Sequence, residues 1–272
     1  MNKQIQNRKG ARKIADVPKE ILELLNKGQI ETVNLTEWLA IDHAVLVRSV
    51  FPELGISKEI IDVISKEVKE QKKPTAMNSV KLIGGALYDF FADRDDLQKV
   101  FANLSTHRSD TVRSYAPFLI SLNPNLELEK QLNQVKVLVA DKHFGVREIV
   151  WIAMRPEIDK NLKEAIAFLC VWAETKDENI RRFTTEATRP RGVWCKHIDA
   201  LKEQPELALP ILEKLKSDPS KYVQDSLANW LNDASKSRPE FVIDLCNKWK
   251  KESPTKATER IVKRARRTID KK

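Results

Sequence analysis

The chain of 272 residues carries 48 Lys and Arg against 39 Asp and Glu, a net charge of +9, and 42% of its residues are apolar. The apolar fraction can form a core, which excludes wholesale disorder, and no run approaches the ~18 apolar residues that a membrane-spanning helix needs. Seven glycines are too few for a glycine-rich phosphate loop and favour helices joined by short connections. The three distant cysteines form no CxxC pair and the first residues contain no apolar signal segment, so we expect a reduced, cytoplasmic protein.

The N-terminal segment is strongly basic. Residues 1–15 contain Lys3, Arg8, Lys9, Arg12 and Lys13 and no acid. Such a segment either binds a polyanion or is a solvated tail, and the sequence leaves both interpretations open. We expect a basic, flexible segment over 1–15, followed by one domain over 16–272.

A weak internal repeat begins near residue 107. Four segments place a polar turn before a helix that starts with a Val or Ile anchor, and the spacings between successive anchors are 34, 34 and 43 residues, with a fifth anchor 39 residues later. The anchors are Val112, Val146, Ile180, Val223 and Val262. HEAT and armadillo repeats have periods of roughly 34–47 residues. The sequence therefore predicts an all-α, HEAT-like or ARM-like α-α superhelical solenoid with a concave basic face, the alternative being an ordinary helical bundle.

The turns of the repeat carry acids that fit helix starts. Asp141, Asp177 and Asp218 suit N-cap or first-turn positions, where a carboxylate meets unpaired backbone N–H groups. The sequence also predicts Pro219 at the first position of a helix.

Residues 144–156 place Arg147, Trp151 and Arg155 on one helix face, with Glu148 beside them. Arg147 is a candidate for a phosphate contact, whereas Trp151 is more simply a core residue.

Residues 184–198 read TTEATRPRGVWCKHI and combine a carboxylate, two arginines and a tryptophan. Pro190 cannot lie inside a helix, so a helix should end near Ala187 and a basic loop should lead to Trp194. One interpretation makes Trp194 a core aromatic and Glu186 a surface acid. The other is nucleic-acid contact, with arginine on phosphates and the indole on a base face.

Two later segments carry polar residues at helical spacing. Asn229, Asn232 and Asp233 share one face of a predicted helix. A carboxylate that faced a polyanion there would be repelled unless it served chemistry. A second row lines up near the end of the chain and could bind a phosphate backbone; it consists of Arg260, Lys263, Arg264 and Arg267.

These segments together resemble the AlkC branch of the AlkC/AlkD superfamily, the HEAT-like-repeat DNA glycosylases that remove alkylated bases. The resemblance is carried by VREIVWIAMRP, EATRPRGVW, LKSDPSKYVQDSLANWLNDASKSRP and TERIVKRARRTI, and it extends to LLNKGQIETVNLTEWLAIDHAVL at residues 24–46. Some members carry an immunoglobulin-like domain after the repeats. The sequence ends after the arginine row, so we expect that domain to be missing and the DNA contacts to come from the repeats.

The resemblance implies a set of site residues and a DNA-binding concave face. The implied catalytic residues are Asp233, Glu186, Trp194 and Glu148. The implied DNA-binding residues are Arg147, Arg189, Arg191, Arg260, Lys263, Arg264 and Arg267. We expect no metal ion and no cofactor.

The implied activity is hydrolysis of the N-glycosidic bond of 3-methyladenine, 3-methylcytosine or 1-methyladenine in duplex DNA, by a monofunctional, monomeric and nucleoid-associated enzyme. Two alternatives remain open. One is a non-catalytic HEAT-repeat protein that prefers branched or distorted DNA. The other is a HEAT-type scaffold for protein interactions, which would not need the arginine row.

Overall fold

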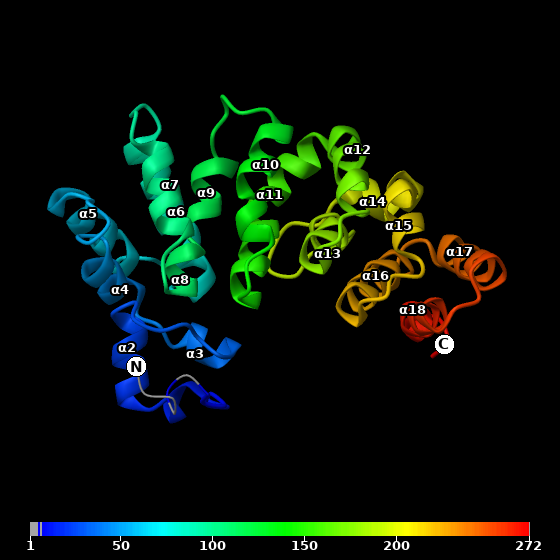
Figure 1. Ribbon diagram of the computed structural model, residues 1–272, viewed down its shortest axis with the longest axis horizontal. Helices are drawn as coiled ribbons and strands as arrows, with labels where there is room; N and C mark the ends of the chain where they lie inside the picture. Colours follow the sequence, from blue (N-terminus) through cyan, green and yellow to red (C-terminus); the bar gives the residue numbers. More distant parts are fainter. Residues whose placement is uncertain (1–4, 6, 272) are drawn as a thin grey trace. The chain divides into compact units, whose positions relative to one another are not determined.

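The computed structural model describes residue 5 and residues 7–271, and these residues form helices and connecting turns with no β-strand among them (Figure 1). Their contacts divide the chain into two compact units. Unit 1 comprises Met1–Leu126 with His143–Ile149, and unit 2 comprises Glu127–Lys142 with Val150–Lys272. This division falls elsewhere than the boundary expected after residue 15. The expected flexible segment lies partly outside the described residues, and the expected boundaries stay predictions.

Unit 1 consists of short helices and the first turns of a longer one. They are η1 (Ile14–Asp16), α2 (Lys19–Asn26), α3 (Leu35–Leu39), α4 (His43–Val50), α5 (Lys58–Lys69), α6 (Ala76–Phe91), α7 (Leu97–Ser105), α8 (Asp110–Arg113), α9 (Ala116–Ser121) and the start of α11 (Phe144–Lys160). Helices α4, α5, α6 and α9 pack in succession. A Cβ atom on Gly84 of α6 would lie 2.6 Å from the Cβ of Phe118 on α9, so a glycine permits this close approach.

The described part of the basic N-terminal segment is held to unit 1. The Arg8 guanidinium donates to both carboxylate oxygens of Glu37, at 2.8 and 2.6 Å, and to the carbonyl of Glu31 at 2.6 Å. Both side chains of this pair are largely buried. Arg8 is therefore used inside the fold, whereas Lys3 lies outside the described residues.

Unit 2 contains α10 (Leu128–Val139), the rest of α11, α12 (Leu162–Trp172), α13 (Glu178–Ala187), α14 (Asp199–Glu203), η2 (Pro205–Ala208), α15 (Leu209–Leu215), α16 (Lys221–Ala234), α17 (Pro239–Glu252), α18 (Lys256–Ala265) and η3 (Arg266–Thr268). Helix α16 packs between α13 and α18, and these three helices form one layer. Helices α12 and α15 pack on each other in the second layer, and α17 packs against α18 and α16. Each successive pair thus contributes one helix to each layer, which is the arrangement of HEAT-like repeats.

The predicted anchors of the repeat are all buried. The exposed fractions are 0% for Val112, Val146 and Val223, 2% for Val262 and 7% for Ile180. The 34–43-residue spacing therefore marks buried core positions in α8, α11, α13, α16 and α18, one helix in each successive repeat.

One predicted helix N-terminus agrees with the structure and another does not. Asp177 is the N-cap of α13 and accepts a hydrogen bond from the Asn179 N–H at 2.7 Å, as predicted. The prediction for Pro219 is wrong, because α16 begins at Lys221 and Ser220 is its N-cap. The Asp218 carboxylate instead accepts hydrogen bonds from the Arg181 guanidinium of the preceding repeat, at 2.7 and 3.0 Å. The helix therefore starts two residues after the predicted position.

Candidate active site and nucleic-acid interface

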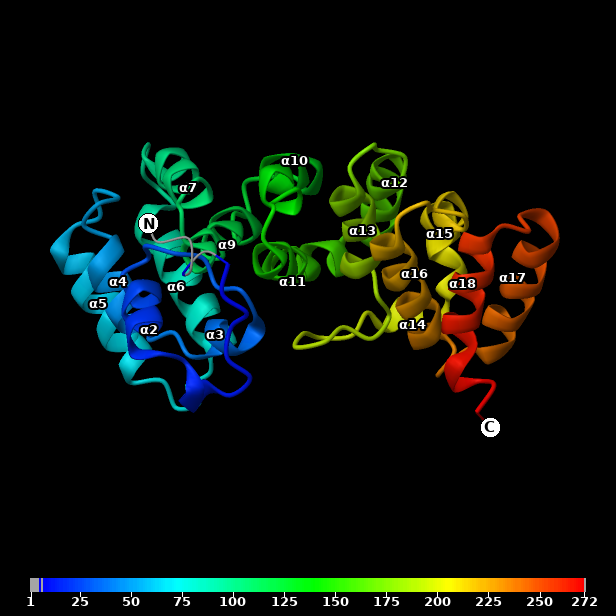
Figure 2. The ribbon, with the colours of Figure 1, turned by 60° about the horizontal axis from the view of Figure 1, so that its bottom comes forward.

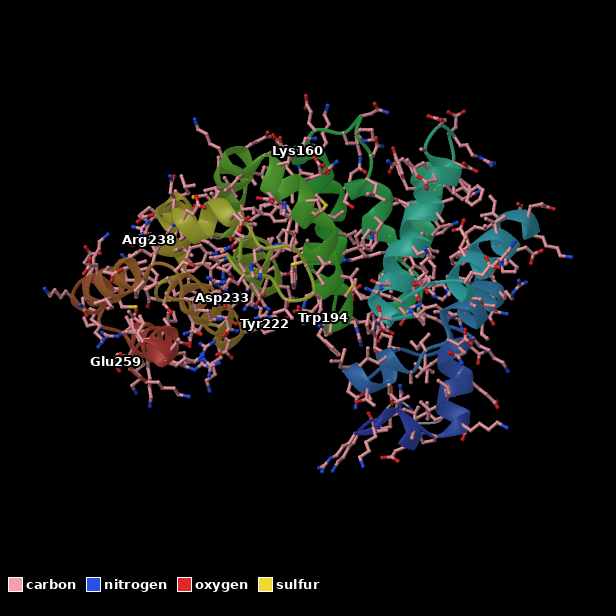
Figure 3. The ribbon with its side chains drawn as sticks, turned by 180° about the vertical axis from the view of Figure 1, so that it is seen from behind. Lys160, Trp194, Tyr222, Asp233, Arg238 and Glu259 are labelled. Atoms are coloured by element: carbon pink, nitrogen blue, oxygen red, sulfur yellow. The ribbon has the colours of Figure 1, made fainter. Side chains whose placement is uncertain are left out.

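Two carboxylates predicted as site residues lie on neighbouring helices of unit 2. Glu186 is in the last turn of α13, which ends at Ala187 as Pro190 predicts, and Asp233 is in the last turn of α16 (Figure 3). Their exposed fractions are 3% and 4%. Buried charges of this kind persist only when they are paired, so their partners determine what the site can do.

We call Glu186 and Asp233 the acid pair, and Arg189 forms hydrogen bonds with both of them. Its Nε and Nη2 atoms donate to Asp233 Oδ2 at 2.9 and 2.6 Å, and its Nη1 atom donates to Glu186 Oε2 at 3.3 Å. Burial alone would lower the pKa of Arg189, but the charges of Glu186 and Asp233 outweigh burial and raise that pKa. The resemblance assigned Arg189 to the DNA backbone, whereas the structure uses it to bring the acid pair together.

Two further cations occupy the remaining oxygens of the acid pair. Arg182 Nη2 lies 3.0 Å from Glu186 Oε1, and its guanidinium carbon lies 4.0 Å from the centre of the Tyr222 ring. Lys236 Nζ lies 2.9 Å from Asp233 Oδ1, and the Lys236 side chain is 44% exposed. The pair is thus contacted by three cations, and the five charges sum to +1. The most exposed of these five side chains is that of Lys236. The sequence did not single out Lys236, although it lies three residues after Asp233.

Trp194 does not join the acid pair. It lies on the segment between α13 and α14, which extends away from both helices (Figure 2), and it is 54% exposed next to Val193 at 49%. Among the residues that the structure describes, its ring makes no hydrogen bond or ring contact. Its φ of 60° is left-handed, a conformation that costs a residue with a side chain roughly 1–2 kcal/mol. The core interpretation of Trp194 is therefore wrong, and its indole faces solvent.

The same segment carries Arg191, which donates from Nη2 to the hydroxyl of Ser237 at 2.7 Å. Ser237 lies in the turn that follows α16. Arg191 therefore contacts the turn that follows the helix carrying Asp233.

The arginine row of α18 lies along a polar row of α16. Arg260 Nη2 and Arg264 Nε lie 2.6 and 2.9 Å from Asp225 Oδ1. Arg267 donates to Asn229 Oδ1 at 3.0 Å. Burial and the neighbouring Arg264 lower the pKa of Arg267. One acid thus faces this row of three arginines, and the row keeps an excess of positive charge.

Two residues of these segments lie elsewhere than their spacing suggested. Lys263 lines a cavity of about 650 Å³ between α17 and α18, together with Lys250 and Arg266, instead of joining the row. Asn232 is buried and donates to the Ala265 carbonyl at 3.1 Å and to the Thr268 hydroxyl at 2.8 Å. Asn232 therefore fastens the end of α18 to α16.

Arg147 and Glu148 belong to unit 1, so their predicted roles at the acid pair's site stay predictions. Both side chains are partly buried and engaged with other groups. Arg147 directly follows an anchor, as Arg113 and Arg181 do. Arg113 donates to the carbonyls of His107 and Arg108, and Arg181 donates to those of Thr175 and Lys176, six and five residues upstream. The repeat position thus favours closing the preceding turn over binding phosphate.

No three or more His, Cys, Asp or Glu side chains gather to hold a metal ion anywhere in the described ranges. Likewise, none of the helices over those ranges is both long and apolar enough to cross a membrane.

No protein-family model matches the chain. Over 138 residues the chain is 44% identical to YhaZ of Bacillus subtilis (strain 168), itself an uncharacterized protein; the match covers 51% of this chain and only 37% of YhaZ.

Two solved structures are similar over most of the chain. The AlkC alkylpurine DNA glycosylase of Pseudomonas fluorescens, bound to DNA containing an abasic-site analog, gives a TM-score of 0.68 at 22% identity over 96% of this chain and 66% of that one. AlkD2 of Streptococcus mutans gives a TM-score of 0.58 at 24% identity over 78% of this chain and 99% of that one. The chain has the AlkC/AlkD fold. The predicted all-α, HEAT-like fold class is thereby confirmed.

Proposed function

We propose that the chain is a DNA glycosylase of the AlkC/AlkD type, which hydrolyses the N-glycosidic bond of cationic alkylated bases in duplex DNA. The observation that carries this proposal is the buried acid pair, Asp233 and Glu186, with the arginine row of α18 lying along α16, the helix that carries Asp233. The fold shared with AlkC, whose structure contains DNA with an abasic-site analog, supports it.

The arginine row and the acid pair would interact with different parts of one DNA substrate. Arg260, Arg264 and Arg267 would contact backbone phosphates, because guanidinium groups bind phosphate oxygens in a fixed, forked geometry. A buried carboxylate gains nothing from phosphate. It would instead stabilise positive charge, and a cationic base or a sugar with oxocarbenium character supplies that charge.

The chemistry asks little of a general acid. A base such as 3-methyladenine already carries a positive charge when attached to the sugar, so it leaves without being protonated. Asp233 would stabilise the charge that builds on the deoxyribose and would orient the attacking water. The exposed face of Trp194 would cover the cationic base. We infer a monofunctional hydrolase that leaves an abasic site and acts as a monomer.

Before Asp233 can act, one of its oxygens has to be released. Lys236 is the partner suited to leave, because its side chain is 44% exposed and its ammonium group would exchange Asp233 Oδ1 for a phosphate oxygen. Arg189, only 14% exposed, would stay on Oδ2 and keep the carboxylate in place. DNA binding would thus uncover the carboxylate oxygen that faces the sugar.

A second candidate function is DNA binding without catalysis, with a preference for branched or distorted DNA. The observation that favours it is the excess of cations around the acid pair, three against two carboxylates, which attracts phosphate even if no base is excised. A protein scaffold is the weakest reading, because an arginine row of this kind is not needed for protein binding.

The deciding experiment measures free bases released from methylated duplex DNA by the full chain, with the Asp233→Asn variant purified identically to exclude a contaminating glycosylase. Release of 3-methyladenine, 3-methylcytosine or 1-methyladenine by the wild type alone supports the glycosylase. Salt-sensitive duplex binding without any release supports the non-catalytic alternative. Binding that ignores salt contradicts both, since each phosphate contact contributes a slope of about 0.9.

A further inference from the structure

A buried arginine on α11 holds the segment 187–198, which we call the Trp194 loop. Arg155 is 2% exposed, and its guanidinium donates to three backbone carbonyls of this loop. Nε donates to Lys196 at 2.8 Å, Nη1 donates to Ala187 at 3.0 Å, and Nη2 donates to Arg189. One side chain therefore ties the beginning of the loop to its end.

Burying the charge of Arg155 costs more free energy than burying a neutral side chain would. Its hydrogen bonds go to neutral carbonyls, and within the described residues it forms no ion pair. Burial accordingly lowers the pKa of Arg155. A buried cation without a carboxylate in contact opposes folding. Arg155 should therefore have a role that a neutral side chain could not fill, and we call its three hydrogen bonds to the loop the clamp.

The loop is packed directly onto the clamp. A Cβ atom on Gly192 would overlap Cys195 Sγ of the same loop and lie 3.1 Å from the guanidinium carbon of Arg155, so a side chain at this position would force the loop to shift. Two further hydrogen bonds fasten the carbonyls of Thr188 and Pro190. The Ile198 N–H donates to Pro190 at 3.1 Å, and the Trp230 indole donates to Thr188 at 2.9 Å.

The carbonyls bound by Arg155 lie close in sequence to Arg189 and Trp194, the two loop side chains with roles in the proposed chemistry. Arg189, whose carbonyl accepts from Arg155, sends its own guanidinium between Glu186 and Asp233. Trp194 lies two residues before the clamped carbonyl of Lys196 and has the strained left-handed φ. Strain of this kind persists only where the surroundings fix the backbone.

We infer that Arg155 is a positioning residue: by holding the Trp194 loop in one shape, it sets where Arg189 meets the acid pair and where the Trp194 indole is presented to DNA. The first part of this inference concerns the loop alone. The second part, an effect on excision, rests on the proposed function.

The loop itself is tested by trypsin under native conditions. Trypsin can cut after Arg191 and after Lys196, and intact-mass analysis identifies both cuts. We expect Arg155→Met to raise the cleavage rate at these two bonds at least tenfold and Arg155→Lys to raise it less, because an ammonium group cannot reach three carbonyls with one planar fork. Equal rates in Arg155→Met and wild type would overturn the inference.

A matched control separates this effect from general destabilisation. Arg181 is a mostly buried arginine of the same unit that donates to the carbonyls of Thr175 and Lys176 and to Asp218, away from the loop. We expect Arg181→Met to lower the melting temperature without accelerating cleavage after Arg191 or Lys196. Equal acceleration in both variants would show only a loss of stability.

A second variant keeps the test valid if Arg155→Met does not fold. Gly192→Ala leaves the charge in place but sets a methyl group against Cys195 Sγ and the guanidinium, so the loop has to shift and the same two cuts should accelerate. Unchanged cleavage in Gly192→Ala contradicts the loop assignment.

Excision kinetics then test the second part on a methylated duplex. We expect Arg155→Met and Gly192→Ala to lower kcat about 10- to 100-fold, because small misplacements of reacting groups have effects of this size. KM and the affinity for undamaged duplex should change less than threefold, and Arg181→Met should keep its kcat at a temperature where it is folded. If the wild type excises nothing, the proposed function fails while the cleavage result still stands; faster cleavage with unchanged kcat leaves Arg155 a structural residue only.

Discussion

Asp110 and Asp233 are almost fully buried carboxylates, one from each unit, and they have different kinds of partners. Asp110 in unit 1 is 1% exposed, and Asp233 in unit 2 is 4% exposed. Asp110 accepts from the backbone N–H of Thr32 at 2.9 Å and from its hydroxyl at 2.7 Å, with His143 Nδ1 at 3.4 Å. Within the part of the chain that the structure describes, Asp233 accepts hydrogen bonds only from the cations Arg189 and Lys236.

The difference separates a structural acid from a candidate functional one. Burial raises the pKa of Asp110, and its partners join segments 78 residues apart in the sequence. The backbone N–H and hydroxyl of Thr32 are uncharged and buried, so no phosphate competes for them. The cations on Asp233 do have one, because phosphate binds both guanidinium and ammonium groups. Partner chemistry, more than burial, thus distinguishes the two sites.

The largest expected effect is on excision by Asp233→Asn. The amide keeps the size of the side chain but removes the negative charge that would stabilise the sugar cation, so base release should fall at least about 100-fold. Affinity for duplex DNA should stay the same or rise, since a negative charge near the phosphates is lost. Single-turnover release and fluorescence anisotropy measure the two effects, and near-normal release sinks the assignment of Asp233.

Asp110→Ala should show the reverse pattern. Removing this carboxylate leaves two buried donors of Thr32 without a partner, which costs about 2–4 kcal/mol of the free energy of unfolding. Urea unfolding monitored by circular dichroism measures the loss. Excision per folded molecule should be unchanged, and a fall in excision comparable to that of Asp233→Asn would remove the distinction between the two acids.

The arginine row gives a smaller effect that does not depend on damage. Arg264→Ala and Arg267→Ala should each weaken binding to damaged and undamaged duplex about equally and reduce the salt slope by about 0.9. Lys263→Ala provides the comparison, because Lys263 lines the cavity between α17 and α18 and should have less influence. Selective loss of binding to damaged DNA in the arginine variants would contradict a role at the phosphates.

Part of this arrangement could be predicted from the sequence. Pro190 fixed the expected end of α13 at Ala187, and the anchor spacing identified the core positions, because both depend on local geometry along one helix. The partners across helices could not be predicted. Spacing places Arg155 on a face of its helix but does not reveal that this face meets three carbonyls of a loop more than thirty residues away.

The same limit applies to the acid pair. The sequence suggested Asp233 and Glu186 separately, through a polar helix face and a resemblance. That Arg189 would join them, and that Lys236 would cover the second oxygen, depends on how α13 and α16 pack. A side chain predicted to contact DNA therefore turned out to have an intramolecular partner.

A further expected effect concerns the pH dependence of stability and sharpens the contrast within unit 1. Burial lowers the pKa of His43 to about 4, and its ring nitrogen Nδ1 lies 2.8 Å from the Tyr115 hydroxyl. Between pH 6.5 and 4 the unfolded chain binds a proton at His43 that the folded chain does not, so this group lowers stability as the pH falls, by at most about 1.4 kcal/mol per pH unit.

Asp110 has the opposite effect on stability, because its raised pKa lets the folded chain bind a proton at a higher pH than the unfolded chain does. The free energy of unfolding of His43→Gln should therefore fall less steeply than that of the wild type over this range, in urea unfolding at successive pH values. Parallel curves would mean that His43 is protonated in the folded protein.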